Sequence, residues 1–297
     1  MKALLAAAFW AVSTVMLTAQ TRRVSTIPLN ALRSLFAALF VFLLLPFGNA
    51  IDELRDMSAA TAIAMIGSGI LAMAVADSLY FVCLATLGAA LSVPITNSVY
   101  PILSLLLAAL WLDETITAAV LAGTVLVIIG IFLLLYRKEP AAASAFSPIL
   151  PRVLAGMSRS TAFLLLMISS FFFALSSTWL RAGAGDLGPI AVGSLRIAAS
   201  TGVLLPVLYA PPVRTGLRRL TTRDILIIAI AGVIGVGVGT LFFTAAIIDI
   251  GAGRTAILTS TMPLFTLPLA VLFLHERVTP QIILGTIICI LGIWFII

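Results

Sequence analysis

Apolar runs long enough to cross a bilayer recur along almost the whole chain. A helix needs about 20 residues to cross roughly 30 Å of hydrocarbon, and breaks in hydropathy divide the 297 residues into ten segments of this kind. Hydrophobic residues make up 62% of the chain and charged residues only 9%, which leaves no polar stretch long enough for a separate soluble domain. Nothing in the pattern indicates a strand. We therefore expect an all-α, polytopic membrane protein with ten transmembrane helices.

The one linker-like stretch lies at 137–159, RKEPAAASAFSPILPRVLAGMSR, where prolines, small residues and basic groups interrupt the apolar runs. It divides the chain into a first five-helix unit (1–136) and a second (160–297). The first segment, MKALLAAAFWAVSTVMLTAQ, also fits a secretory signal peptide, but the repeat described next requires it as a retained helix. The expected helices are approximately 3–21, 27–47, 59–84, 89–112, 116–136, 160–181, 188–209, 223–248, 252–274 and 278–297.

The two units are copies of each other. With a shift of 162 residues, VYPILSLLLAALWLDETIT falls on TMPLFTLPLAVLFLHERVT, so that Pro101 aligns with Pro263 and Glu114 with Glu276. With a one-residue slip, Arg33 aligns with Arg196. The sequence thus predicts a duplicated unit, and because each copy has five spans, the second copy enters the membrane from the opposite side as an inverted repeat.

Charges in the loops support opposite orientations. Eleven Lys and Arg residues fall in the loops that follow the first, fifth, seventh and ninth helices, whereas four fall on the other side. By the positive-inside rule the first set is cytoplasmic, which places both termini outside. The same assignment explains the net charge of +6 without nucleic acid as a partner.

The duplicated LxExxT motifs, the LxxGxxxxxxG pattern at 116–130 and 278–292, and the paired SLRIAA and LRSLFAA arginines resemble the drug/metabolite transporter superfamily, in particular its EamA-type members. The resemblance covers nearly the whole chain. It implies an exporter of amino acids or related metabolites in the bacterial inner membrane, with the aromatic amino-acid exporters as the nearest subgroup. His275 departs from the small residue usual at its position, whereas Asp113 is nearer the common pattern.

Glu114 and Glu276 stand between consecutive helices, just before the second of each pair begins. We expect both to close structural turns, each carboxylate accepting from the free amides of the helix that follows it. Arg33 and Arg196 lie several residues inside their helices, where arginine is costly. Each is either an anchor bonded to loop carbonyls or a receptor for a substrate carboxylate.

Asp77 lies late in the third helix, deep enough for ionisation to be costly. Three hypotheses are open: it receives a substrate ammonium, it carries a coupling proton, or it is a protonated side chain packed against a neighbouring helix.

One face of the fourth helix and the matching face of the ninth combine proline with polar groups, which indicates a cavity lining or a polar packing seam. Deep aromatic side chains supply possible apolar walls. The predicted substrate-binding residues are Trp10, Ser13, Asp77, Tyr80, Asn97, Tyr100, Phe242, Phe243 and Thr259, and the predicted hinge residues are Pro94, Pro101 and Pro263.

We expect a transporter and not an enzyme. The single histidine and two separated cysteines offer no catalytic or metal-ligand cluster, and the glycine run GVIGVGVGT lacks the lysine of a phosphate-binding loop. We therefore predict no cofactor, a small-molecule substrate, contact with membrane lipid and a monomer that suffices for function. The alternatives are a carrier for another small metabolite or drug and, less favoured, a structural subunit of the membrane.

Overall fold

The computed structural model describes residues 1–18, 20, 26–87, 89–135, 157–218, 220–274 and 280–296. Every regular element in these ranges is helical, which confirms the all-α prediction. The elements are α1 (Lys2–Thr18), α2 (Thr26–Leu44), α3 (Ala50–Asp56), α4 (Ala59–Gly69), η2 (Ile70–Ala76), α5 (Asp77–Leu87), α6 (Ala89–Leu112), α7 (Ala118–Leu135), α8 (Arg159–Gly183), α9 (Pro189–Leu204), η3 (Leu205–Tyr209), α10 (Pro211–Leu217), α11 (Thr222–Ala231), η4 (Gly232–Gly239), α12 (Thr240–Ile250), α13 (Ala252–Thr259), α14 (Met262–Leu274) and α15 (Pro280–Ile296).

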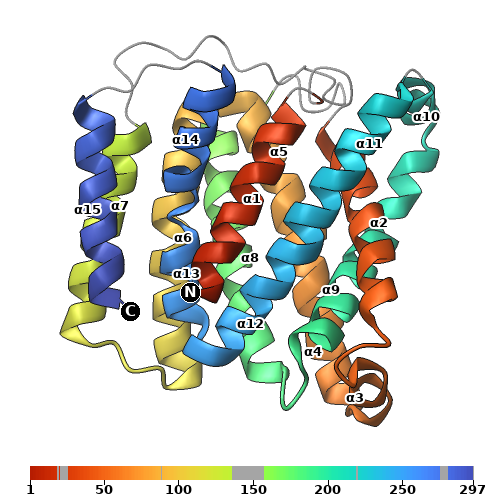
Figure 1. The fold of residues 1–297 in the computed structure, drawn as a ribbon, viewed down its shortest axis with the longest axis horizontal. Helices are drawn as coiled ribbons and strands as arrows, with labels where there is room; N and C mark the ends of the chain where they lie inside the picture. The colour runs from red at the N-terminus through yellow and green to blue at the C-terminus, as the bar shows by residue number, and fades with distance from the viewer. Residues whose placement is uncertain are drawn as a thin grey trace.

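The long helices stand side by side in one bundle, with α7 and α15 as a pair at one edge (Figure 1). Both termini lie toward the same end of the bundle, which is also the end of α3, whereas α10 lies at the opposite end. Six stretches of the described chain are long and apolar enough to cross a membrane, and three shorter apolar helices accompany them. The chain is therefore a multi-pass membrane protein, and its ten spans stay a prediction.

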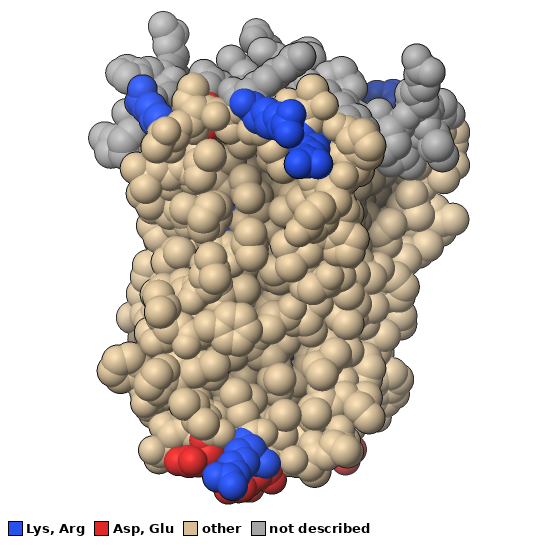
Figure 2. All heavy atoms as spheres, turned by 90° about the vertical axis from the view of Figure 1, so that its right-hand side faces the viewer, with Lys and Arg blue, Asp and Glu red and all other residues tan. Residues whose placement is uncertain are grey.

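Charge gathers at the two ends of the bundle and is sparse between them (Figure 2). The short helix α3 carries Asp52, Glu53 and Asp56 at the end of the termini. At the other end, α10 carries Arg214 and the start of α11 carries Arg223. An apolar belt between two polar ends is the surface expected of a protein that crosses hydrocarbon.

The described helices differ from the predicted ones at two short helices and three interruptions. Sequence periodicity missed α3 and α10, because each has only seven residues. Wider π-helical turns, η2 and η4, interrupt the third and eighth predicted helices, and the ninth is broken between α13 and α14. The prolines respond differently: α6 continues through Pro94 and Pro101, whereas Pro263 directly follows the break.

The two π-helical segments occupy corresponding places, since Ile70 and Gly232 are 162 residues apart. A glycine at the start of each lets another helix approach closely. A Cβ on Gly69 would meet the backbone of Arg196, and a Cβ on Gly232 would meet the backbone of Arg33. Each arginine helix therefore crosses the π-helical span of the other half at backbone contact.

Helix starts and helix pairing also recur between the halves. Ser58 accepts from the Thr61 amide to cap α4, and Thr221 accepts from the Asp224 amide to cap α11. The helices α7 and α15 pack closely along a small-residue seam in which Cys289 Sγ lies 3.6 Å from the Val127 carbonyl oxygen, 162 residues away. Small residues at such a seam are typical of helix pairs in membranes.

Candidate functional site

Four hydroxyl groups from three helices meet inside the bundle. Ser104 of α6 lies 3.3 Å from Ser177 of α8, and the Tyr100 hydroxyl lies close to those of Ser177 and Thr259 of α13. We call Tyr100, Ser104, Ser177 and Thr259 the hydroxyl cluster. Ser104, Ser177 and Thr259 are buried, whereas Tyr100 is partly exposed. The structure thus brings together two of the predicted binding residues, Tyr100 and Thr259, which come from different halves of the chain.

The hydroxyl cluster has limited free capacity in this conformation. Thr259 donates to the Thr255 carbonyl, and Ser104 lies 3.3 Å from the Ala252 carbonyl at the start of α13. The ring of Phe173 closes one side of Tyr100, at 6.2 Å between ring centroids. Hydroxyl groups that exchange a local acceptor for a ligand are suited to a polar solute.

The predicted aromatic residues gather near the end of η4. Trp10 packs on Phe243 at 5.2 Å between centroids, and the Phe9 ring stacks on Phe242 at 5.6 Å. The Trp10 indole also lies where a side chain on Gly239 would be. These contacts belong to an apolar cluster shared by α1, α9 and α12. The aromatic residues can therefore supply the apolar wall predicted from the sequence.

Three other predicted residues have local partners. Asn97 donates from Nδ2 to the Val93 carbonyl of its own helix, 2.9 Å away. Tyr80 lies against Phe81, its neighbour in the chain, at 5.8 Å between ring centroids. Ser13 is buried and donates to the Ala231 carbonyl at 2.8 Å. Their predicted contact with substrate requires that these groups turn toward it.

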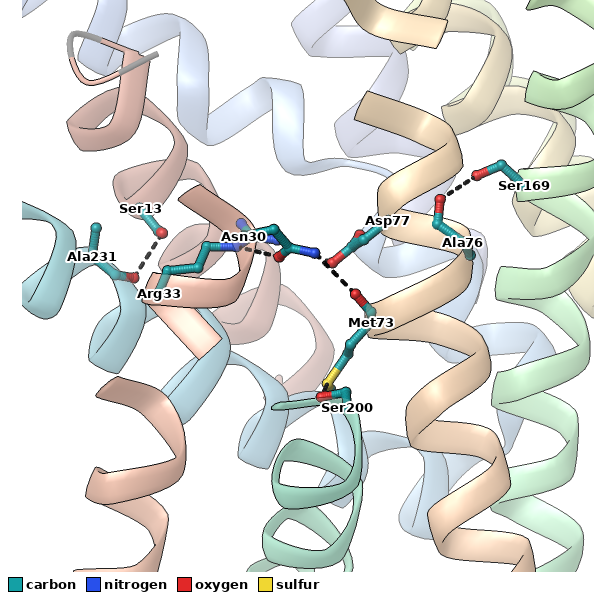
Figure 3. A network of polar contacts seen from close by, with 9 residues as sticks. All are labelled: Ser13, Asn30, Arg33, Met73, Ala76, Asp77, Ser169, Ser200 and Ala231. Carbon is teal, nitrogen blue, oxygen red and sulfur yellow. Dashed lines mark hydrogen bonds and ion pairs between the residues drawn. The ribbon is translucent and has the colours of Figure 1, made fainter. Parts of the chain in front are cut away.

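Asp77 has a basic partner that sequence reasoning did not identify. Arg33 Nη2 lies 3.0 Å from Asp77 Oδ2, and Arg33 Nε donates to Asn30 Oδ1 at 2.9 Å (Figure 3). Asn30 in turn donates to the Met73 carbonyl in η2 at 3.0 Å. The Arg33 guanidinium also lies over the Phe81 ring, 5.2 Å from its centroid.

This network links α2 to the point where η2 becomes α5. The two charged side chains are 17% and 23% exposed, so the pair is mostly desolvated. Of the readings of Arg33 drawn from the sequence, neither the loop-carbonyl anchor nor a free carboxylate receptor matches, because Asp77 already supplies the carboxylate. An ion pair at this depth neutralises two charges that hydrocarbon would otherwise disfavour.

Arg196 has a different environment from Arg33. It is 1% exposed, and its guanidinium donates to the Ser68 hydroxyl and, at 3.3 Å, to the Ser176 hydroxyl. Its Nε has no hydrogen-bond partner among the described residues. Tyr100 is near enough to interact with it electrostatically, which connects Arg196 to the hydroxyl cluster.

Two serines hold the π-helical spans by equivalent bonds. Ser13 donates to the Ala231 carbonyl, and Ser176 donates to the Ser68 carbonyl at 2.7 Å. The numbers of donors and acceptors differ by 163 in both cases, as Arg33 and Arg196 do. A π-helical turn leaves backbone carbonyls that its own helix does not satisfy, and these hydroxyls supply the missing donors.

Glu114 lies in the predicted turn but caps a different helix from the one expected. Its two carboxylate oxygens accept from the amides of Ala252 and Gly253, at 2.8 and 3.2 Å, at the start of α13. The cap of α7 is instead Thr117, whose hydroxyl accepts from the Val120 amide. The expectation that Glu114 serves the following helix was wrong, because the turn folds back onto the other half. Glu276 lies outside the described residues.

Two further polar contacts join the halves near the end of the termini. Glu53 accepts from the Gly188 amide at 2.8 Å, just before α9 begins. Lys2 of α1 pairs with Asp249 of α12 at 2.7 Å, with both side chains about half exposed. Together with Glu114, they tie the first half of the chain to the second on this side.

Sequence reasoning missed the serines and the asparagine that complete these networks. Asn30, Ser68, Ser176 and Ser177 are small polar residues inside apolar helices, a type usually assigned to packing. One signal was present for Asn30, which precedes Arg33 by one helical turn and so shares its face. Within the described ranges, no group of three or more His, Cys, Asp or Glu side chains is arranged to hold a metal ion.

The comparisons agree with this architecture. A family model described as the EamA-like transporter family matches residues 1–136 and 160–297. A protein of Archaeoglobus fulgidus, named an uncharacterized transporter, is 30% identical over 130 residues, and the match spans 44% of this chain and 45% of that protein. A crystal structure of another protein has a TM-score of 0.74 at 18% identity, covering 99% of this chain and 95% of its own. The last likeness shows the shared fold.

Proposed function

Because the chain belongs to the EamA-like transporter family, we propose that it is a secondary transporter that exports amino acids and related small metabolites across the bacterial inner membrane. Aromatic and other neutral amino acids are the first candidates, in line with the aromatic wall of Trp10, Phe242 and Phe243. The membrane-spanning fold and the family support transport. The substrate and the direction are part of the proposal.

We propose further that ten spans form two inverted five-helix units, residues 1–136 and 160–297, joined by the linker 137–159. The equivalent serine bonds to Ala231 and Ser68, and the equivalent glycine contacts at Arg33 and Arg196, support this arrangement. In other transporters, inverted units of this kind exchange two related conformations about a site near the bilayer midplane.

The observation that carries the proposal is the hydroxyl cluster. Polar groups inside a membrane bundle are costly and usually mark a solute pathway. Here Tyr100 and Thr259 come from α6 and α13, the helices that the duplication pairs, and they meet beside Ser177. A solute at this position would lie between the halves, so movement of one half against the other would expose it to either side.

The helices α13 and α14 provide a place for such movement. The break at Ser260 and Thr261 removes helical continuity directly before Pro263, which cannot restore the missing backbone hydrogen bond. Carboxylate contacts from Glu114 and Glu53 hold the end of the termini closed in this conformation. Their release would accompany opening toward that side.

Counterflow in liposomes tests the proposal. Purified protein would be reconstituted in vesicles loaded with unlabelled solute and supplied outside with trace labelled solute, across a panel of amino acids, organic acids, amines and drugs. We expect saturable accumulation of neutral amino acids above that of protein-free vesicles. Accumulation of a drug or an unrelated metabolite alone would favour the other carrier function. No accumulation of any solute by protein that remains folded would contradict transport and favour a structural subunit.

A further inference from the structure

Arg196 is a buried cation without a counter-charge in the described structure. Its side chain is 1% exposed, and no carboxylate of the described residues forms an ion pair with it. Its polar partners are the hydroxyl groups of Ser68 and Ser176, both of which also donate to backbone carbonyls, of Met65 and Ser68 respectively. Neutral hydroxyls can accept from the guanidinium but cannot neutralise it.

The guanidinium also keeps free donors. Arginine carries five N–H groups in a rigid planar fork, and the two serines accept one each from different terminal nitrogens. The Nε atom has no partner in the described parts of the chain. Nε and the neighbouring terminal nitrogen together form the edge that binds a carboxylate with two parallel hydrogen bonds.

The equivalent arginine in the first half shows what this edge lacks. Arg33 has Asp77 at 3.0 Å as its counter-charge. The position 162 residues after Asp77 is Gly239, and the Trp10 indole occupies the space beside it. The second half therefore supplies no acid at the matching place.

The hydroxyl cluster extends the binding surface around Arg196. Tyr100 lies within electrostatic range of the guanidinium, and its hydroxyl is close to Ser177 and Thr259. Ser176, which accepts from Arg196, directly precedes Ser177 in α8. A ligand held at the arginine would thus meet hydroxyl donors on one side and remain inside the bundle.

We propose that Arg196 is the recognition site for a carboxylate group of the transported solute. The inference rests on the proposed transport function and narrows its substrates to organic acids and amino acids, as distinct from amines and cationic drugs. The arginine is occluded in the present conformation, and it becomes reachable when α8 and α9 separate from the third span. A carboxylate then supplies both the missing charge and the acceptors for the free edge.

Matched solutes test the inference in the counterflow assay. Phenylalanine, phenylpropionate and phenethylamine share one ring but differ in which charged group they carry. We expect unlabelled phenylalanine and phenylpropionate to compete with labelled phenylalanine, and phenethylamine to compete at least about tenfold more weakly, because hydrogen bonds to charged groups contribute strongly to affinity. Equal competition by the amine would overturn the inference while leaving transport intact.

Variants identify the residue responsible. In Arg196→Gln, the apparent affinity for both acids should fall at least about tenfold, and Arg196→Lys, which keeps the charge but loses the fork, should fall between the two. Arg181→Gln, an exposed arginine on α8, is the matched control and should leave the affinities unchanged. Unchanged acid affinity in folded Arg196→Gln would overturn the inference. If that variant does not fold, unchanged affinity in Arg196→Lys has the same meaning.

A binding measurement separates failure of the inference from failure of transport. If no solute accumulates in vesicles, the proposed function fails, and thermal unfolding of the detergent-purified protein then decides the anion site. Stabilisation by phenylpropionate but not by phenethylamine, absent in Arg196→Gln or Arg196→Lys, would support the site. Absence of stabilisation by either acid would contradict it.

Discussion

Arg33 and Arg196 occupy equivalent positions in the two halves, but their side chains meet different surroundings. The backbone of each lies against a glycine of the opposite half, Gly232 and Gly69. Arg33 pairs with Asp77 and keeps some exposure, whereas Arg196 is buried among hydroxyl groups. The duplication preserved the crossing of the helices and changed the electrostatics around it.

The difference separates what the repeat needs for folding from what a site needs for binding. Close helix crossing depends on glycine and on serine bonds to free carbonyls, and both occur in both halves. The ion pair occurs only in the first half of the described chain. A neutralised arginine stabilises the bundle, whereas an arginine without a counter-charge attracts an anion.

The largest effect is expected from breaking the ion pair. Asp77→Ala leaves the Arg33 charge mostly desolvated, and we expect a loss of about 3 kcal/mol in the free energy of unfolding, the low end for a broken buried pair because some exposure remains. Unfolding in detergent monitored by denaturant or heat measures it. The double variant Asp77→Ala with Arg33→Met should recover part of the loss. The exposed pair gives the control, since Asp249→Asn should cost less than about 1 kcal/mol.

Equal effects in the two halves are expected from the crossing glycines. Gly69→Ala and Gly232→Ala each place a Cβ against the backbone of an arginine, and overpacking of this kind costs about 1–3 kcal/mol. Gly202→Ala on α9 meets nothing within 4 Å and should leave stability unchanged or raise it. A large loss at one crossing and none at the other would refute the shared geometry.

A smaller effect is expected from the carboxylate that caps α13. Glu114→Ala removes the acceptors of the Ala252 and Gly253 amides, and the loss of a helix cap costs about 1 kcal/mol. Thr117→Ala, which uncaps α7, should cost a similar amount. In transport, however, only Glu114→Ala should change the balance between conformations, because only Glu114 ties the two halves together. Identical transport by both variants would remove the gating role of Glu114.

The smallest effects compare the equivalent serines. Ser13→Ala removes one hydrogen bond to a π-helical carbonyl, worth about 1 kcal/mol. Ser176→Ala removes the equivalent bond and also a partner of Arg196, so its loss of stability should be the larger. Melting temperatures of the two purified variants make the comparison. Equal losses would mean that the contact between Ser176 and Arg196 contributes nothing measurable.

The sequence predicted the helical fold well because each span must satisfy its own backbone in hydrocarbon and so leaves a long apolar run. It did not predict the π-helical segments or the break before α14, which depend on packing between helices. The candidate site was anticipated in part: Tyr100 and Thr259 come together, and Trp10 meets Phe243. The partner of Asp77 and the cap supplied by Glu114 were missed, since both contacts join residues that are far apart in the chain.

The orientation of the two halves can be measured directly at a pair of equivalent positions. Asp52 of α3 and Arg214 of α10 are 162 residues apart and exposed, and the native cysteines, Cys83 and Cys289, are buried. Single variants Asp52→Cys and Arg214→Cys would be treated in intact cells with a membrane-impermeant maleimide. The inverted arrangement predicts labelling of Asp52→Cys from outside and of Arg214→Cys only after the membrane is permeabilised. Labelling of both from the same side would contradict it.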